Sequence, residues 1–170
     1  LQDREVTFMG VGGARMQAAG LICLAEFETL SVNGFREPIL RLPQLYRLYR
    51  ELSTTLVEAR IDAFVGIDFN VFNFILEARL KRQGIPTAHY VSPSVYAWRR
   101  GRTKKVAHSA DKLFCLFPFE PAFYASHDVD ARFIGHPMAA EIPRQAGSDE
   151  ARKGARLSLG LDANDIILAL

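Results

Sequence analysis

The chain has 170 residues, of which 49% are hydrophobic and 24% charged, and its formal net charge at pH 7 is only +2. This composition is ordinary for a soluble globular protein, and the weak overall charge excludes general attraction to polyanions, so an anion site has to be a local cluster of cations. No apolar run is long enough to span a bilayer.

Strand and helix patterns alternate along the sequence. In chain order, we expect a strand over 6–10, helices over 14–19 and 42–59, a strand over 63–67, a helix over 72–83, a strand over 87–91, a helix over 99–109, a strand over 112–117, a helix over 120–126, a strand over 131–135, a helix over 155–159 and a strand over 165–170. This alternation predicts an α/β fold, a Rossmann-like doubly wound parallel sheet built from right-handed βαβ units.

The run 63–67 is apolar without alternation, which is typical of a strand buried on both faces.

The domain boundary is expected after residue 143. Residues 145–153 are polar and charged and are predicted to form a linker or surface loop. We therefore expect one domain over 1–143 and, over 144–170, a linker and the start of a second domain. Because the chain opens and closes on strand patterns, we expect it to be an excerpt of a longer protein.

Asp68 follows the run 63–67 directly, at the carboxyl end of a predicted strand and just before a helix. Ligands of open α/β sheets bind at this edge, where a carboxylate is able to accept a proton from a sugar hydroxyl. The alternative is that Asp68 caps the helix by accepting hydrogen bonds from backbone N–H groups. Asn70 and Asn73 are also suited to capping, which partly releases Asp68 for another role.

The segment 89–100 begins as a strand and breaks at Pro93. The loop that follows combines hydroxyls, aromatic rings and cations, a content suited to a ligand that is both polar and anionic. Ser92 and Ser94 are able to hydrogen-bond a phosphate or a sugar. Trp98 either stacks on a sugar face or packs in the core.

Five cations stand within seven residues at the end of this loop. They favour binding to phosphate, acidic lipid headgroups or nucleic acid, and the alternative is a solvated helix face. We expect Arg99, nearest the loop, to clamp a phosphate with two hydrogen bonds. The five are Arg99, Arg100, Arg102, Lys104 and Lys105.

Apolar residues and arginines are interleaved without a regular period over residues 30–43. The mixture suits a segment that faces lipid, with apolar side chains among acyl chains and arginines at headgroups. Packing against the rest of the domain fits the pattern equally well. The residues expected at the lipid surface are Phe35, Arg36, Ile39, Leu40 and Arg41.

The remaining reactive residues predict no separate site. Cys23 and Cys115 lie in apolar surroundings, far apart in the sequence, and are expected to be buried free thiols. The four histidines lack metal-ligand spacing and are expected to be structural. His136, at a strand end before Pro137, is also placed to line a cleft.

Five motifs in order resemble those of the lipid-A-disaccharide synthase family over nearly the whole chain. They are GGARMQAAG at 12–20, VGID with a following Phe-Asn at 65–73, YVSPSVYAWR at 90–99, FPFE at 117–120 and FIGHP at 133–137. One departure is Asn70-Val71, where the family pattern has Pro-Asp. The resemblance implies the amino-terminal, acceptor-side domain of a two-domain GT-B glycosyltransferase, truncated at both ends, with its first strand missing and the donor-binding domain beginning after residue 143.

By this resemblance, the reaction transfers 2,3-diacylglucosamine from UDP to the 6-hydroxyl of 2,3-diacylglucosamine 1-phosphate (lipid X), with inversion, to give a β-1,6 disaccharide. It implies Asp68 as general base, the acceptor phosphate on Arg99 and Arg100, and no metal or other cofactor. The residues expected to bind substrate are Ser92, Ser94, Trp98, Arg99, Arg100, Asn73 and His136.

The implied partners are UDP-2,3-diacylglucosamine, lipid X and the anionic inner-membrane surface, with no nucleic acid; a homodimer is left open. The implied location is cytoplasmic, peripheral to the inner membrane, and the excerpt alone is expected to be inactive. Two rival functions fit parts of the pattern. One is another nucleotide-sugar enzyme of this architecture, a transferase or an epimerase. The other is a non-enzymatic module that binds polyanions through residues 99–105, although the balanced net charge disfavours it.

Overall fold

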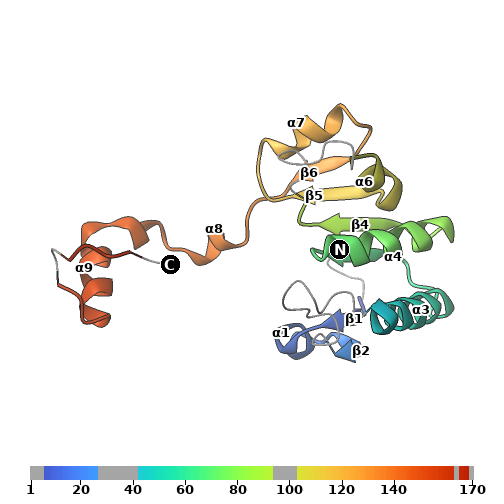
Figure 1. Ribbon diagram of the computed structural model, residues 1–170, viewed down its shortest axis with the longest axis horizontal. Helices are drawn as coiled ribbons and strands as arrows, with labels where there is room; N and C mark the ends of the chain where they lie inside the picture. Colours follow the sequence, from blue (N-terminus) through green and yellow to red (C-terminus); the bar gives the residue numbers. More distant parts are fainter. Residues whose placement is uncertain (1–5, 27–41, 94–102, 163–164, 169–170) are drawn as a thin grey trace.

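The computed structural model describes residues 6–26, 42–93, 103–162 and 165–168. Strands and helices alternate along this part of the chain (Figure 1). The strands are β1 (Met9–Gly12), β2 (Ile22–Glu26), β3 (Phe64–Ile67), β4 (Thr87–Tyr90), β5 (Lys112–Cys115) and β6 (Ala131–Phe133). The helices are α1 (Ala14–Ala18), α3 (Leu42–Glu58), α4 (Asn70–Arg82), α6 (Thr103–Ser109), α7 (Glu120–Ala125), α8 (Met138–Glu141), the 3-10 helix η3 (Arg144–Gly147) and α9 (Asp149–Ser158).

Every strand pair in the described residues is parallel. One sheet has the order β3-β4-β5-β6, and β1 pairs with β2 in a second sheet. Consecutive strands of the larger sheet are joined through α4, α6 and α7, which is the βαβ arrangement. The predicted α/β fold with parallel strands is confirmed. Strand β2 was not predicted, because an apolar run as short as Ile22–Glu26 does not distinguish a strand from a helix.

Helix α4 is the centre of the packing. It contacts α3, α6, β3 and β4. Leu76 and Leu80 on α4 pack with Leu56 of α3 in one buried cluster. A second buried cluster lies where α6, β5 and α7 meet, and it consists of Val106, Leu113, Cys115, Tyr124 and Val129.

The prediction that residues 63–67 are buried on both faces is wrong. Val65 and Ile67 are 51% and 49% exposed, whereas Gly66, on the opposite face toward α4, is buried. The reason is positional: β3 ends the four-stranded sheet, and among the described residues a helix covers only one of its faces.

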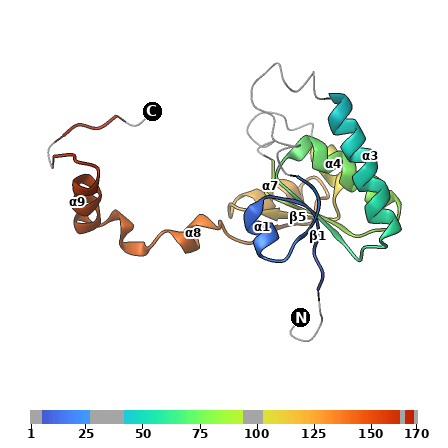
Figure 2. The same ribbon diagram turned by 90° about the horizontal axis from the view of Figure 1, so that it is seen from below.

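Two predictions near the end of the chain also differ from the structure. The loop expected over 145–153 is mostly helical, because Ser148 caps α9 by accepting a hydrogen bond from the Ala151 N–H at 3.1 Å. Acidic Asp149 and Glu150 then stabilise its first turn. The described residues 165–168 form no strand, and Ile166 is fully exposed with no strand beside it in the described residues. Helix α9 lies apart from the sheet in both views (Figures 1 and 2).

Within the described residues, none of the helices combines the length and apolar character needed to cross a membrane.

The two thiols differ in their surroundings. Cys115 is fully buried, as predicted, whereas Cys23 is exposed, contrary to the prediction, because β2 is paired only with β1 in the described structure. Burial and the nearby Glu120 carboxylate raise the pKa of the Cys115 thiol to about 11, against the opposing effect of a hydrogen bond with Ser92.

We therefore expect iodoacetamide at about pH 8 to alkylate Cys23 and to leave Cys115 unmodified, because the thiolate is the nucleophile. Peptide mass spectrometry of the folded protein measures both modifications, and the same reaction in denaturant is the control that labels both. Modification of Cys115 in the folded protein at a rate near that of Cys23 would contradict this expectation.

Candidate functional site

The carboxyl ends of the four parallel strands define one edge of the sheet. Ile67 pairs with Tyr90, Tyr90 with Phe114, and Cys115 with Phe133, so the residues that follow each strand lie side by side. The backbone N–H of Asp68 donates to the Tyr90 carbonyl at 2.9 Å. Asp68, the beginning of the loop after β4, and the segment after β6 therefore share the edge where such sheets bind ligands.

Asp68 lies on a strained turn. Asp68 and Phe69 have φ values of 47° and 40°, in the left-handed region that residues other than glycine rarely adopt. The Asn73 side-chain amide donates to the carbonyls of Asp68 at 2.8 Å and Ile67 at 3.2 Å, which holds the turn. Strain of this kind clusters at functional sites, where the rest of the fold maintains it.

The Asp68 carboxylate does not cap α4. The N-cap residue is Phe69, and no side chain caps the helix. The expected caps Asn70 and Asn73 lie inside the first turn because α4 begins at Asn70, so their side chains point to other partners. The Asp68 residue is exposed, and its Oδ1 accepts one long hydrogen bond of 3.5 Å from Asn70 Nδ2. The carboxylate is accessible to a substrate hydroxyl.

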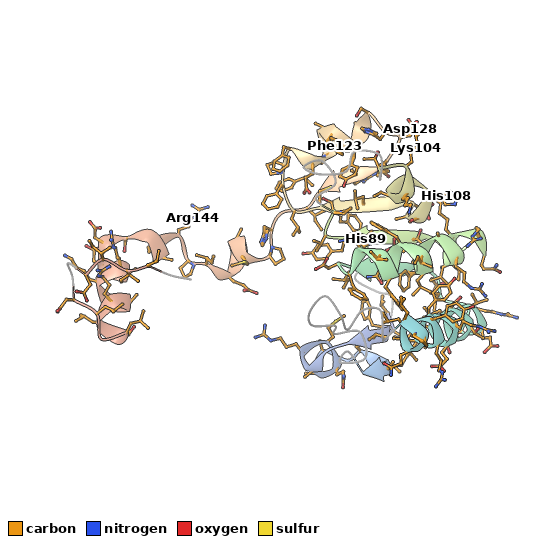
Figure 3. The ribbon with its side chains drawn as sticks, viewed as in Figure 1. His89, Lys104, His108, Phe123, Asp128 and Arg144 are labelled. Atoms are coloured by element: carbon orange, nitrogen blue, oxygen red, sulfur yellow. The ribbon has the colours of Figure 1, made fainter. Side chains whose placement is uncertain are left out.

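A buried polar cluster lies directly behind this turn. His89 on β4 and Glu77 on α4 are both 0% exposed, and His89 Nδ1 lies 2.7 Å from Glu77 Oε1. His89 Nε2 lies 3.1 Å from Asn70 Oδ1, and the Phe74 ring packs 4.4 Å from the His89 ring. Figure 3 shows His89 on β4, beside α4.

The sequence analysis did not predict that Glu77 is buried against His89. Its position one residue after Leu76 and three before Leu80 places it on the buried stripe of α4, which is the signal that was available. A carboxylate on such a stripe requires a buried partner.

The beginning of the loop after β4 is anchored to α7. The buried Ser92 hydroxyl donates to Glu120 Oε1, while the Phe117 N–H donates to Glu120 Oε2 at 2.8 Å. The Tyr124 hydroxyl donates to the Pro93 carbonyl at 2.9 Å. The Ser92 proton is thus engaged in a structural hydrogen bond. Sugar binding by Ser92 stays a prediction, in which the hydroxyl oxygen would act only as an acceptor.

His136 lies at the same sheet edge, after β6. Its Nδ1 accepts a hydrogen bond from the Met138 N–H at 3.2 Å, and its ring lies 5.9 Å from that of Phe117. The Phe117 ring stacks in turn on Phe119 at 5.6 Å and 15°. Both phenylalanines are exposed, and they provide an aromatic surface, not predicted from the sequence, on which a sugar or a base is able to stack.

Several predicted residues lie outside the described residues. They are Ser94, Trp98, Arg99, Arg100 and Arg102 in the loop, and Phe35, Arg36, Ile39, Leu40 and Arg41 in the proposed lipid segment. Of the cation run, Lys104 and Lys105 are described; both are exposed on α6, as the solvated-face alternative had it.

The described residues contain no group of three or more side chains able to hold a metal ion. A shallow hollow of about 470 Å³ lies between α6 and α7, lined by Lys104, Ala107, His108, Ser126, His127 and Asp128. Residues 126–128 precede β6, so this hollow is at the opposite edge of the sheet (Figure 3). It is separate from the site around Asp68.

Parallel strands and intervening helices define a Rossmann-like α/β domain, a class whose members bind ligands at the carboxyl edge, where the exposed Asp68 carboxylate lies. A family model described as lipid-A-disaccharide synthetase matches residues 1–170, and the chain belongs to this family. The resemblance noted in the sequence is thereby confirmed.

Three relatives illustrate the match. The chain is 47% identical over 166 residues to lipid-A-disaccharide synthase of Pseudomonas aeruginosa strain LESB58, covering 98% of this chain and 43% of the relative. It is 45% identical over 166 residues to that of Neisseria meningitidis strain FAM18, covering 98% and 42%. It is 46% identical over 170 residues to that of Xanthomonas oryzae pv. oryzae strain MAFF 311018, covering 100% and 38%. The chain thus spans about two fifths of the length of these relatives.

Proposed function

We propose that the complete protein containing this chain is an inverting glycosyltransferase. It moves 2,3-diacylglucosamine from UDP to the 6-hydroxyl of lipid X and forms the β-1,6 lipid A disaccharide. The observation that carries the proposal is the Asp68 carboxylate, which is exposed, does not cap α4 and lies at the carboxyl edge of the sheet. The chain that presents it belongs to the lipid-A-disaccharide synthetase family.

Asp68 is the general base of this scheme. Its carboxylate accepts the proton of the 6-hydroxyl as the hydroxyl oxygen bonds to the anomeric carbon, and the bond from that carbon to UDP breaks on the opposite face. The departing pyrophosphate takes the electron pair, so the configuration inverts and UDP leaves. Asn73 keeps the base in place through its bonds to the turn.

The acceptor lies along the loop after β4. Arg99 and Arg100 bind its phosphate, and Ser94 and Trp98 contact the sugar. His136 lines the same edge, beside the exposed Phe117 ring, which offers an apolar surface for the sugar or its acyl chains.

The lipid substrates require contact with a membrane. The mixed apolar and basic segment docks the protein on the anionic inner-membrane surface from the cytoplasmic side, with acyl chains and headgroups contacted together. Residues 1–143 form the acceptor-side domain and 144–170 lead into the donor-binding domain; the separation of α9 from the sheet supports this division (Figure 2). The members of the segment are Phe35, Arg36, Ile39, Leu40 and Arg41.

The proposal is tested by incubating the complete protein with UDP-2,3-diacylglucosamine and lipid X in detergent micelles. We expect the disaccharide phosphate and UDP in equal amounts by mass spectrometry, and little product with UDP-N-acetylglucosamine, which lacks the long acyl chains. A UDP-sugar epimer in place of a disaccharide, or equal turnover of the donor without long acyl chains, would refute the assignment.

A further inference from the structure

We infer that a hydrogen-bonded chain of three side chains, Glu77, His89 and Asn70, positions the Asp68 carboxylate for proton removal. The inference rests on the proposed role of Asp68 as base. None of the three touches substrate in this scheme, so they are positioning residues.

The groups follow one another without a gap. Glu77 Oε1 and His89 Nδ1 are 2.7 Å apart, and His89 Nε2 and Asn70 Oδ1 are 3.1 Å apart. Asn70 Nδ2 then lies 3.5 Å from Asp68 Oδ1. The hydrogen-bonded chain begins in the core, where Glu77 and His89 are 0% exposed. It passes through half-buried Asn70 and ends at exposed Asp68. The last bond is long, as catalytic hydrogen bonds often are before substrate binds.

The hydrogen bonds on the substrate side of His89 run in one direction, from His89 Nε2–H through the Asn70 amide to the Asp68 carboxylate. An amide has one acceptor oxygen and one donor nitrogen, so with the Asn70 nitrogen toward the Asp68 carboxylate its oxygen faces His89. His89 Nε2 then faces an acceptor and carries a proton, and a second hydrogen bond joins His89 Nδ1 to Glu77 Oε1. Flipping the Asn70 amide would set its oxygen against the Asp68 carboxylate and remove the donor.

The His89 Nε2–H fixes the Asn70 amide, and the amide fixes Asp68. Since an amide does not pass a proton along, the chain acts by orientation: Oδ1 is held and Oδ2 faces the substrate hydroxyl. The chain is itself rigid, because Phe74 packs on the His89 ring at 4.4 Å and Gly66 leaves room for the Glu77 carboxylate against β3. Glu77 Oε2 is buried with no partner among the described residues, so Glu77 depends on His89 for its polar contact.

The positioning chain requires the side-chain amide of Asn70. A proline at that position has no side-chain amide and would leave both His89 Nε2 and Asp68 Oδ1 without this partner. Because the positioning chain orients the base and does not touch substrate, its loss should affect turnover more than binding.

The first test uses Asn70→Ala in the complete protein, with disaccharide synthesis as readout. We expect kcat to fall about tenfold, the loss of one hydrogen bond to a charged group, while KM for lipid X changes by less than about twofold. The melting temperature should stay within a few degrees, because Asn70 lies at a helix end. Val71→Ala, at the neighbouring side chain that is 71% exposed, is the matched control and should retain full activity.

The double variant Asp68→Asn/Asn70→Ala separates this inference from the proposed function. If Asn70 acts through Asp68, the double variant is no slower than Asp68→Asn alone. If the losses in kcat of the two single variants multiply, or if kcat of Asn70→Ala stays within about twofold of wild type, the positioning chain is overturned and Asp68 is left as base. An Asp68→Asn enzyme with activity near that of the wild type would instead refute Asp68 as the base, and failure of the complete wild-type protein to form the disaccharide would refute the proposed function. Nitrogen-15 NMR of labelled histidine should show a proton on His89 Nε2, and an unprotonated Nε2 would also overturn the inference.

Discussion

Replacing Asp68 by Asn is expected to lower kcat for disaccharide synthesis by about a hundredfold or more, the range for removal of a general base. Asparagine has nearly the same shape but does not accept the proton of the attacking hydroxyl. It also tolerates the left-handed backbone at φ 47°, so the turn should persist. Steady-state kinetics with lipid X varied, together with a thermal melt, measure both effects.

The exposed position of Asp68 makes folding nearly insensitive to this change. Among the described residues, the carboxylate caps no helix and accepts one hydrogen bond of 3.5 Å. Asp62→Asn, an exposed carboxylate just before β3, is the matched control and should leave kcat unchanged. Asp68→Ala adds the cost of the turn, so comparing it with Asp68→Asn separates chemistry from conformation. Activity of Asp68→Asn within a few-fold of wild type would reduce Asp68 to a turn residue.

The sequence predicted the order of helices and strands because each of these elements is set by residues that are close together along the sequence. The stripe Leu48, Leu52 and Leu56 has helical spacing and is buried in α3. Gly84, with φ of 80°, ends the segment after α4, as glycine does at many helix ends. Asp68 was predicted at the carboxyl edge from the same alternation of strand and helix.

Tertiary partners were not predictable in this way. Glu77 and His89 are 12 residues apart and meet only because α4 packs across β4. Ser92 and Glu120 are 28 residues apart, and the sequence did not predict that the Ser92 hydroxyl holds the loop to α7. The exposure of Val65 depends on which strands neighbour β3, and a single strand's composition does not contain that information.

Gly66→Ala is expected to cause the largest loss of stability, about 3 kcal/mol, from overpacking together with a broken hydrogen bond to a charged group. A Cβ at position 66 would overlap Glu77 Oε1 and lie 3.0 Å from Asn73 Cβ. The Glu77 carboxylate is fully buried and bonded to His89, so it has no low-cost way to move aside. Gly66 has no positive φ, which means that the missing side chain, not backbone freedom, is what the position requires.

Hydrogen exchange of the β3 and β4 amides in the complete protein reports this loss locally, without assuming that several domains unfold together. Gly154→Ala in α9 is the matched control, since a Cβ there meets nothing within 4 Å. The clash is tested by repeating Gly66→Ala in a Glu77→Ala background, where its cost should fall to less than half, because only the contact with Asn73 remains. An equal cost in both backgrounds would show that Glu77 is not the reason why position 66 requires a glycine. A reduced cost would instead mean that residue 66 of β3 and the buried carboxylate behind Asp68 form one packed unit.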